Sequence, residues 1–366
     1  MKEPFKLYRL GNHYDTPNVY HQAPDFKAYT GRAEPFENDK ACYWYQYIQA
    51  FDDALNRKNN QKNQPKIALI GFACDQGVNR NQGRIGAKHA PDAIKSSFAK
   101  LPISYQTQQA FQSMAGIVTD AGNVVCDDDT ICPNLLEIAQ QDYADKISTV
   151  LNANALPIGL GGGHEIAWGS FLGLWQHMAV APTPLANIGI INLDAHFDLR
   201  QDQYATSGTP FRQIAEHLDI KEQPFHYLCI GISQFSNTAS LYEQAFDLGV
   251  SVIGDDDCHR LDWQAIEQKI LAFIAPLDVI YLTIDMDCLA GSVMPAVSAV
   301  AAKGLSLDFV ERCVLLIINT GKVKVIDMAE VSPKYDIDGR GLKVAGRLLA
   351  VMVEAVLSSS FKSLSR

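Results

Sequence analysis

Short apolar runs alternate with amphipathic stretches along most of this chain. The runs have the length and composition of buried strands, and they predict strands at 67–72, 156–160, 188–193, 225–230, 252–253, 279–284 and 323–328. The stretches between them predict helices at about 40–55, from 91, after 134, from 164, and at 209–218, 239–248, 262–274, 307–319 and 338–357. Polar or glycine-rich composition predicts irregular segments at 57–66, 77–86 and 124–133.

Strand–helix alternation over this length predicts an α/β fold with a mostly parallel, doubly wound sheet and helices on both faces. No internal repeat or low-complexity linker divides the chain, so we expect a single domain over residues 1–366. Residues 1–65, rich in aromatic and polar side chains, are expected to form an N-terminal extension packed on the core. In sheets of this kind, ligands bind outside the carboxyl ends of the strands.

Three of the predicted strands end in side chains that bind metals. Alternate residues of an extended chain point the same way, so ligands at positions i, i+2 and i+4 can converge on one point. The six candidates share this placement at or just past strand ends: Asp194, His196 and Asp198 after 188–193, Asp285 and Asp287 after 279–284, and His164 after 156–160.

A single Asp or His at a strand end is usually a cap or a solvated loop residue, but a convergent set of six is different. Four carboxylates at the mouth of one sheet repel each other unless cations neutralise them, and two divalent ions balance their charge. Oxygen ligands outnumber imidazoles, which favours Mn²⁺ over zinc. A closed tetrahedral zinc site also needs fewer ligands. The pattern therefore predicts two Mn²⁺ per chain.

The amino-acid composition limits the kinds of partner that this chain can bind. The formal charge of −10 argues against nucleic acid or an anionic membrane surface, so a small-molecule substrate is expected. No apolar run reaches the length of a membrane span, and the first ten residues are charged where a signal peptide needs an apolar region. Eight Cys without a Cys-x-x-Cys pair fit reduced thiols. We therefore expect a cytoplasmic α/β protein.

Three motifs resemble the metal-binding motifs of the ureohydrolases (arginase, agmatinase, formimidoylglutamase): Gly161–Glu165, Asp194–Asp198 and Thr283–Asp287. The resemblance implies the arginase-like three-layer α/β fold, two Mn²⁺, hydrolysis of a C–N bond by a metal-bridging hydroxide, and trimers or hexamers. It also implies that one metal is held by His164, Asp194, Asp198 and Asp285, and the other by Asp194, His196, Asp285 and Asp287, so that Asp194 and Asp285 bridge.

Within that family the chain is most similar to the formimidoylglutamase branch, in the segments 161–165, 198–200, 207–211, 229–233 and 81–86. That branch hydrolyses N-formimidoyl-L-glutamate to L-glutamate and formamide in histidine degradation. Two departures stand out. Ala296 and Val300 replace the Gly and Pro usual after the third motif, and Phe211 or Arg212 stands where arginases have a catalytic-loop His. The second departure argues against arginase activity.

The resemblance also suggests roles for individual residues. Asp198 is the candidate to shuttle a proton to the leaving amine, and Glu330 the candidate to grip the amidinium. Glu330 can also be read as a helix cap or an exposed loop acid. Arg200 suits a substrate with two carboxylates. Further candidates for substrate binding are Arg84, Arg80, Ser207 and Thr209, of which each Arg can equally be a loop anchor.

Two alternatives remain open at this point. The chain can be another ureohydrolase, acting on agmatine, guanidinobutyrate or arginine. It can also be a catalytically silent family member that keeps the fold without full metal occupancy, although the intact set of six ligands argues against this.

Overall fold

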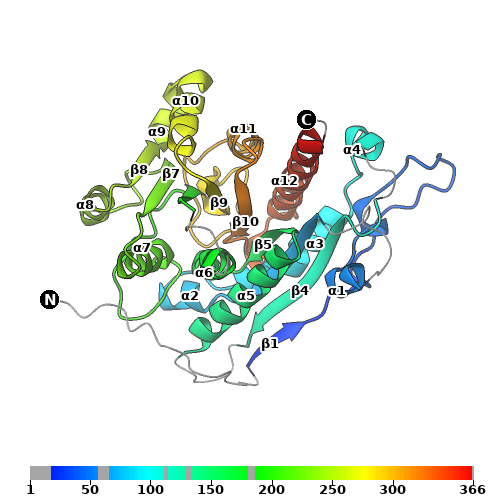
Figure 1. The fold of residues 1–366 in the computed structure, drawn as a ribbon, viewed down its shortest axis with the longest axis horizontal. Helices are drawn as coiled ribbons and strands as arrows, with labels where there is room; N and C mark the ends of the chain where they lie inside the picture. Colours follow the sequence, from blue (N-terminus) through cyan, green and yellow to red (C-terminus); the bar gives the residue numbers. More distant parts are fainter. Residues whose placement is uncertain (1–17, 57–65, 111–113, 128–133, 180–185, 365–366) are drawn as a thin grey trace.

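A single ten-stranded sheet runs through the molecule (Figure 1). The structure is a computed structural model that describes residues 18–56, 66–110, 114–127, 134–179 and 186–364. The strand order is β1-β4-β3-β5-β10-β9-β6-β7-β8, with β2 paired to β4. Every pair is parallel except β1 with β4. The strands are β1 (Val19–Gln22), β2 (Gln49–Ala50), β3 (Ile67–Ala73), β4 (Val118–Cys126), β5 (Leu156–Gly161), β6 (Ile188–Leu193), β7 (His226–Ile232), β8 (Ser251–Gly254), β9 (Val279–Asp285) and β10 (Val323–Ala329).

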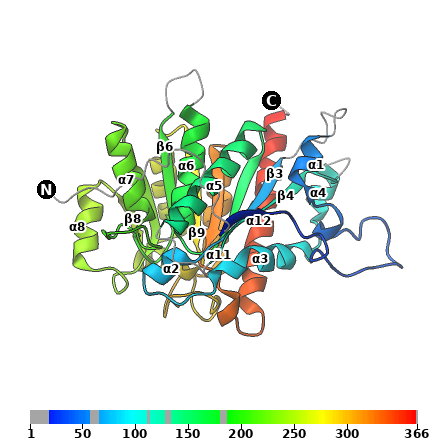
Figure 2. The same ribbon diagram turned by 90° about the horizontal axis from the view of Figure 1, so that it is seen from below.

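Helices cover both faces of this sheet (Figure 2). Residues of α3, α10, α11 and α12 form one apolar core with one face of the sheet, and residues of α5, α6, α7 and α8 form a second core with the other. The helices are α1 (Phe51–Leu55), α2 (Gln76–Arg80), α3 (Ala90–Ala99), α4 (Tyr105–Ala110), α5 (Leu135–Asn152), α6 (Ile166–Ala179), α7 (Pro210–Ile220), α8 (Ala239–Asp247), α9 (Asp255–Arg260), α10 (Trp263–Ile274), α11 (Leu307–Ile318) and α12 (Arg340–Leu364).

The central strands are continuous apolar runs because both of their faces are buried. In β6, Ile190 packs in the core of α5 to α8, while its neighbour Ile191 packs in the core of α3 and α10 to α12. All residues of β3, β6 and β9 are buried. The predicted α/β architecture is therefore confirmed, and the predicted strands at 67–72, 156–160, 188–193, 279–284 and 323–328 are present.

The predicted helix at 40–55 is wrong for residues 40–50 and is present only at its end. Only Phe51–Leu55 is an α-helix, preceded by a 3₁₀ turn at Trp44–Gln46 and by β2. Gln49 and Ala50 pair in parallel with Thr119 and Asp120 of β4, which holds this part of the chain extended. Pairing with a distant strand thus overrides the helical pattern. The first residues of the predicted N-terminal extension lie outside the described part, but β1 and β2 belong to the sheet.

The prediction of an irregular segment from residue 124 is also wrong in part, because β4 continues to Cys126. The apolar pattern of β4 is broken by Thr119, Asp120 and Asn123, yet all three are buried. Asp120 and Asn123 bind the ammonium of Lys95, which satisfies them inside the protein. A strand that carries its own buried polar network is hard to recognise from hydrophobic periodicity. Residues 128–133 lie outside the described part.

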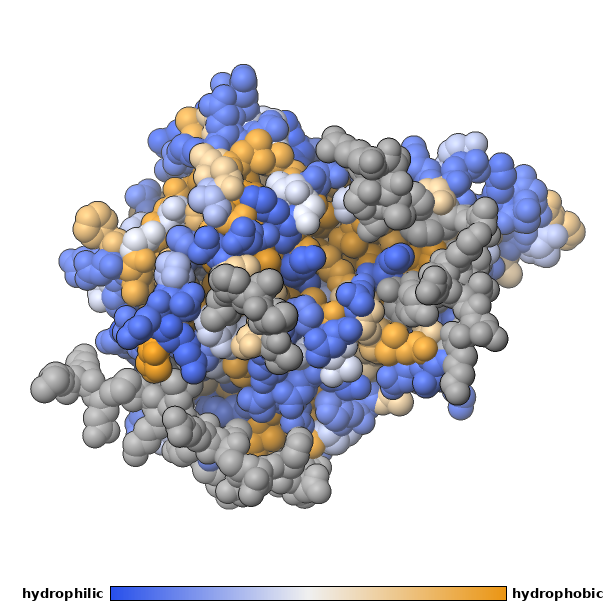
Figure 3. All heavy atoms as spheres, viewed as in Figure 1, coloured by the Kyte–Doolittle hydropathy of each residue, from blue (hydrophilic) through white to orange (hydrophobic). Residues whose placement is uncertain are grey.

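The short helix α2 overlaps the start of the glycine-rich loop at 77–86, where sequence analysis predicted an irregular segment. On the face seen in Figure 3, hydrophilic residues are interspersed with smaller hydrophobic areas.

Among the helices of the described residues, none is both long and apolar enough to cross a membrane.

Candidate metal centre

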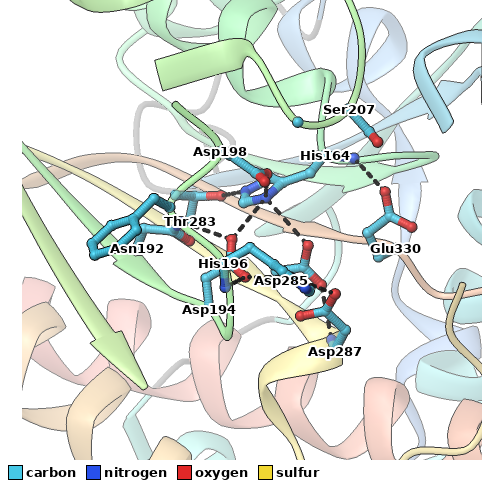
Figure 4. A network of polar contacts seen from close by, with 12 residues as sticks. His164, Asn192, Asp194, His196, Asp198, Ser207, Thr283, Asp285, Asp287 and Glu330 are labelled. Carbon is cyan, nitrogen blue, oxygen red and sulfur yellow. Dashed lines mark hydrogen bonds and ion pairs between the residues drawn. The ribbon is translucent and has the colours of Figure 1, made fainter. Parts of the chain in front are cut away.

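Four neighbouring strands end at one place in the middle of the sheet. In the order β5-β10-β9-β6, they lead to His164, Glu330, Asp285 and Asp194 respectively. Because β10 and β9 lie between β5 and β6, segments far apart in the sequence deliver their side chains to one point. Figure 4 shows these side chains turned toward one another.

The six candidate ligands form two groups that share Asp194. The first is His164, Asp194, Asp198 and Asp285, and the second is Asp194, His196 and Asp287; within each group the ligand atoms lie within 4.8 Å of one another. The Nδ1 atom of His164 is 2.9 Å from an oxygen of Asp198 and 3.2 Å from oxygens of Asp194 and Asp285. The Nδ1 atom of His196 is 3.2 Å from an oxygen of Asp287.

The short distances within the cluster do not mean that its polar atoms are satisfied by hydrogen bonds. The Nδ1 of His164 and the Oδ1 of Asp287 are buried and have no hydrogen-bond partner among the described residues. Both oxygens of Asp194 have donors, the backbone N–H of His196 at 2.7 Å and the side chain of Asn192 at 2.9 Å, and Asp285 accepts the backbone N–H of Asp287 at 2.8 Å. A cradle that orients its ligands and leaves lone pairs converging fits a cation.

The electrostatics of the metal-free cluster point the same way. Burial raises the pKa of Asp285 well above its ordinary value, and the neighbouring Asp287 and Asp194 add to this. Burial and Asp194 raise the pKa of Asp198. Burial acts to lower the pKa of His164, but the surrounding carboxylates raise it well above its ordinary value. The cluster therefore retains protons that divalent cations would displace.

Glu330 is buried beside this cluster and is not an exposed loop acid. One of its carboxylate oxygens accepts the backbone N–H of His164 at 2.9 Å, and its own N–H donates to Gly162. Burial, followed by repulsion from Glu165, raises the pKa of Glu330 well above its ordinary value. Glu330 and Asp198 have φ angles of 66° and 50°, a region that costs free energy for residues other than glycine and that is common at functional sites.

The arginines differ in what they contact. The guanidinium of Arg84 donates to the carbonyls of Ser298 and Val297 at 2.9 and 2.7 Å, and lies 4.1 Å from the ring centre of Tyr335. Arg80 pairs with Glu137 at 2.8 Å. Arg200 is exposed, and its guanidinium has no hydrogen-bond or ion-pair partner within the described ranges. Arg80 and Arg84 thus fasten loops, whereas Arg200 is available to a ligand.

Ser207 and Thr209 lie on the loop before α7. The hydroxyl of Ser207 accepts a hydrogen bond from the side chain of Asn81 at 3.2 Å, which ties this loop to the glycine-rich loop. The hydroxyl of Thr209 donates to the carbonyl of Thr206 at 3.0 Å and accepts its backbone N–H. The hydroxyl of Thr209 therefore stabilises its own loop. Ser207, whose hydroxyl is bound only by Asn81 in the part of the chain that the structure describes, is the better candidate of the two for contact with a ligand.

Sequence analysis missed several polar side chains that support the cluster, among them Asn192, Thr283 and Asp327. Each is fully buried within a mostly apolar strand, in β6, β9 and β10 respectively. A lone polar residue inside a buried strand is a signal that could have identified them, because an unsatisfied polar group there costs free energy.

Comparisons with known proteins agree with this geometry. A family model described as "Arginase family" matches residues 65–354. A formimidoylglutamase of Psychrobacter cryohalolentis is 55% identical over 343 residues, covering 91% of this chain and 98% of the relative. A formimidoylglutamase of Ralstonia nicotianae is 40% identical over 92% of this chain and 97% of its own length.

Solved structures share the fold. A Trypanosoma cruzi formiminoglutamase crystallised with Mn²⁺ superimposes with a TM-score of 0.69 at 24% identity, over 85% of this chain and 99% of that one. A formimidoylglutamase from Bacillus subtilis gives a TM-score of 0.72 at 21% identity, over 88% of this chain and 94% of that one. The predicted arginase-like fold and family resemblance are therefore confirmed: this chain belongs to the arginase family.

Proposed function

We propose that this protein is a manganese-dependent formimidoylglutamase that hydrolyses N-formimidoyl-L-glutamate to L-glutamate and formamide. The observation that carries the proposal is its 55% identity to a formimidoylglutamase along 91% of the chain. A buried cluster of His and Asp side chains with open ligand positions supports a metal-dependent hydrolase rather than a silent family member.

Two Mn²⁺ would be held by the two groups of ligands. His164, Asp194, Asp198 and Asp285 would hold one ion, and Asp194, His196 and Asp287 the other. Asp194 belongs to both groups and is the natural bridge, whereas Asp285 lies in the first group only, so its bridging role stays a prediction. When bound, the ions supply a water acidic enough to act as a nucleophile near neutral pH.

Hydrolysis adds water to the formimidoyl carbon and breaks the bond between that carbon and the nitrogen of glutamate. The departing nitrogen must gain a proton. Asp198 lies at the more exposed edge of the ligand cluster, with one carboxylate oxygen 2.9 Å from the Nδ1 of His164, and is our candidate to carry this proton. Glu330 would accept hydrogen bonds from the cationic amidinium and turn its carbon toward the ligands. Its bond to the backbone N–H of His164 would hold the bound amidinium close to the metal ligands.

The glutamate end of the substrate carries two carboxylates into a region already rich in Asp. The free guanidinium of Arg200 is our candidate to bind one of them in a bidentate way. Ser207 is a candidate for a further hydrogen bond. Arg84 and Thr209, whose polar atoms are engaged elsewhere, are weaker candidates.

This substrate would place the enzyme in histidine degradation and in the cytoplasm. Assembly into trimers or hexamers also remains a prediction, which light scattering coupled to size-exclusion chromatography would check.

A side-by-side assay tests the proposed function. Purified protein is stripped with a chelator, reconstituted with Mn²⁺, and given formimidoylglutamate, agmatine, guanidinobutyrate and arginine, while glutamate, formamide and urea are measured. We expect glutamate and formamide in equal amounts from formimidoylglutamate, and little urea from the other three. Urea as the main product would assign the chain to another ureohydrolase activity. No turnover together with failure to bind Mn²⁺ would favour the silent reading.

A further inference from the structure

The ring of His164 is held from both sides. Its Nδ1 faces the carboxylates of the cluster, while its Nε2 lies 3.0 Å from the hydroxyl oxygen of Thr283 (Figure 4). An imidazole that ligates through Nδ1 must carry its proton on Nε2, because the ligating nitrogen needs a lone pair. In that tautomer Nε2–H donates to Thr283, whose own hydroxyl hydrogen is then free to point elsewhere.

Asp327, a buried acid, is the candidate acceptor for that hydrogen. It faces Thr283 directly on the neighbouring parallel strand, as its register partner between β10 and β9. Both side chains are fully buried. The Oδ2 atom of Asp327 accepts hydrogen bonds from Tyr281 at 2.6 Å and from Ser170 at 2.5 Å. Its Oδ1 atom is buried with no hydrogen-bond partner among the described residues, so one acceptor on this carboxylate is open.

The surroundings keep Asp327 in this position. On the other neighbouring strand its register partner is Gly159, where an added Cβ would come within 2.8 Å of the Cβ of Asp327 and would also collide with the hydroxyl of Tyr143. Only glycine leaves room for the carboxylate there. Burial raises the pKa of Asp327, and the hydroxyls of Ser170, Thr283 and Tyr281 partly offset this. The register of the strands thus sets Asp327 beside Thr283, whose hydroxyl oxygen lies 3.0 Å from the Nε2 of His164.

From this arrangement we propose that Asp327 is a positioning residue for metal binding, acting on His164 through the hydroxyl of Thr283. A carboxylate can only accept, so Asp327 orients the Thr283 hydroxyl toward itself. The Thr283 oxygen then presents a lone pair to Nε2, which requires the N–H there and leaves the lone pair of Nδ1 facing the cation. The chain of contacts sets both the tautomer and the tilt of the ring. It reaches His164 and no other ligand, so its effect belongs to one of the two metals.

The inference rests on the proposed metal binding. Its test distinguishes failure of the Asp327 role from failure of metal binding itself. Mn²⁺ affinity and stoichiometry are measured by calorimetry on chelator-stripped protein, for wild type, Asp327→Asn, Thr283→Val, Thr283→Ser and Tyr281→Phe, with thermal unfolding of each metal-free variant. Thr283→Ser keeps the hydroxyl that Thr283→Val removes. Tyr281→Phe removes a buried hydrogen bond from the same carboxylate but leaves its Oδ1 acceptor in place.

We expect Asp327→Asn and Thr283→Val to weaken one Mn²⁺ equivalent by about 10- to 100-fold, as for other residues that orient metal ligands, and to leave the second within about threefold. Thr283→Ser and Tyr281→Phe should bind both ions like wild type. Wild-type affinity at both sites in Asp327→Asn and Thr283→Val would overturn the inference. So would equal weakening of both sites, which indicates a general structural defect. If Asp327→Asn does not fold, the comparison of Thr283→Val with Thr283→Ser tests the inference by itself. Failure of the wild type to bind Mn²⁺ would instead refute the proposed function.

Discussion

Two clusters of buried charged side chains are built on the same sheet, and they differ in whether all of their polar groups have hydrogen-bond partners. In the first, the ammonium of Lys95 donates to Asp120 at 2.7 Å, to Asn123 at 2.8 Å and to the carbonyl of Gly122 at 3.2 Å. The second oxygen of Asp120 accepts the hydroxyl of Tyr29 at 2.5 Å. All three hydrogens of the ammonium and both oxygens of the carboxylate have partners.

The second cluster is the candidate metal centre, and some of its polar atoms lack hydrogen-bond partners among the residues that the structure describes. Its four carboxylates have no Lys or Arg partner within the described residues, only two imidazoles. The Nδ1 of His164 and the Oδ1 of Asp287 are buried and unpaired. Burial of charge alone therefore does not identify a functional site. A structural ion pair completes its own hydrogen bonds, whereas a ligand site leaves converging lone pairs for an atom that the chain does not supply.

The largest expected effect comes from removing the residue shared by both ligand groups. Asp194→Ala should lose both Mn²⁺ at concentrations that saturate the wild type, and turnover should fall to background, while circular dichroism shows the fold retained. Metal content and formimidoylglutamate hydrolysis measure this, with the exposed Asp202→Ala as the control. Two bound Mn²⁺ and normal turnover in Asp194→Ala would exclude it as a bridge.

The variant Asp285→Ala tests whether Asp285 is a second bridging ligand. Bridging by Asp285 predicts loss of both ions, and retention of one would restrict Asp285 to the group that contains His164.

The closed cluster should behave in the opposite way. Lys95→Met removes one partner of a buried ion pair and leaves Asp120 uncompensated, which should cost about 3–5 kcal/mol of unfolding free energy. Mn²⁺ stoichiometry of the folded fraction should stay at two. Urea unfolding and metal analysis measure the two quantities. The double variant Lys95→Met/Asp120→Asn is the control, because it removes both charges and should recover part of the lost stability. Loss of Mn²⁺ binding in folded Lys95→Met would contradict the separation of the clusters.

A smaller effect is expected at Glu330, the proposed contact of the substrate amidinium. Glu330→Gln keeps the shape and removes the charge, so it should lower kcat/KM for formimidoylglutamate by about ten- to a thousandfold, or roughly 1.4–4 kcal/mol. Both Mn²⁺ should remain bound. Glu243→Gln, an exposed change on α8, serves as the matched control. Unchanged kinetics in Glu330→Gln would return Glu330 to a purely structural role.

The smallest effect should come from the rim. Arg200→Ala removes the one guanidinium of the three compared that is free to contact a ligand, and should raise KM for formimidoylglutamate by about ten- to a hundredfold with metal content unchanged. Arg84→Ala, whose guanidinium is bound to backbone carbonyls, should change KM by less than Arg200→Ala. The reverse order of the two variants would assign the substrate carboxylates to Arg84.

Much of the sheet and the identity of the candidate ligands could be predicted without coordinates. Apolar runs such as 188–193 and 279–284 predict buried strands, and Asp and His at alternate positions after them predict a site at the carboxyl edge. This works because both signals are local: side-chain direction alternates along a strand whatever its neighbours are. The same locality explains the errors. Gln49 and Ala50 are extended because they pair with β4, a strand nearly seventy residues away in the chain and not visible in the local pattern.

The amino-acid sequence by itself therefore determined the α/β architecture, the set of six metal-type ligands and their resemblance to the ureohydrolases. Tertiary structure alone decided which strands are neighbours, so that β10 brings Glu330 and Asp327 between the ligand-bearing strands β5 and β9. It also decided which polar groups are already engaged, separating Arg84 from Arg200 and the closed Lys95 cluster from the open metal centre. The reason is physical: hydrogen bonds between residues distant in sequence depend on register and burial, and neither is encoded in any short segment.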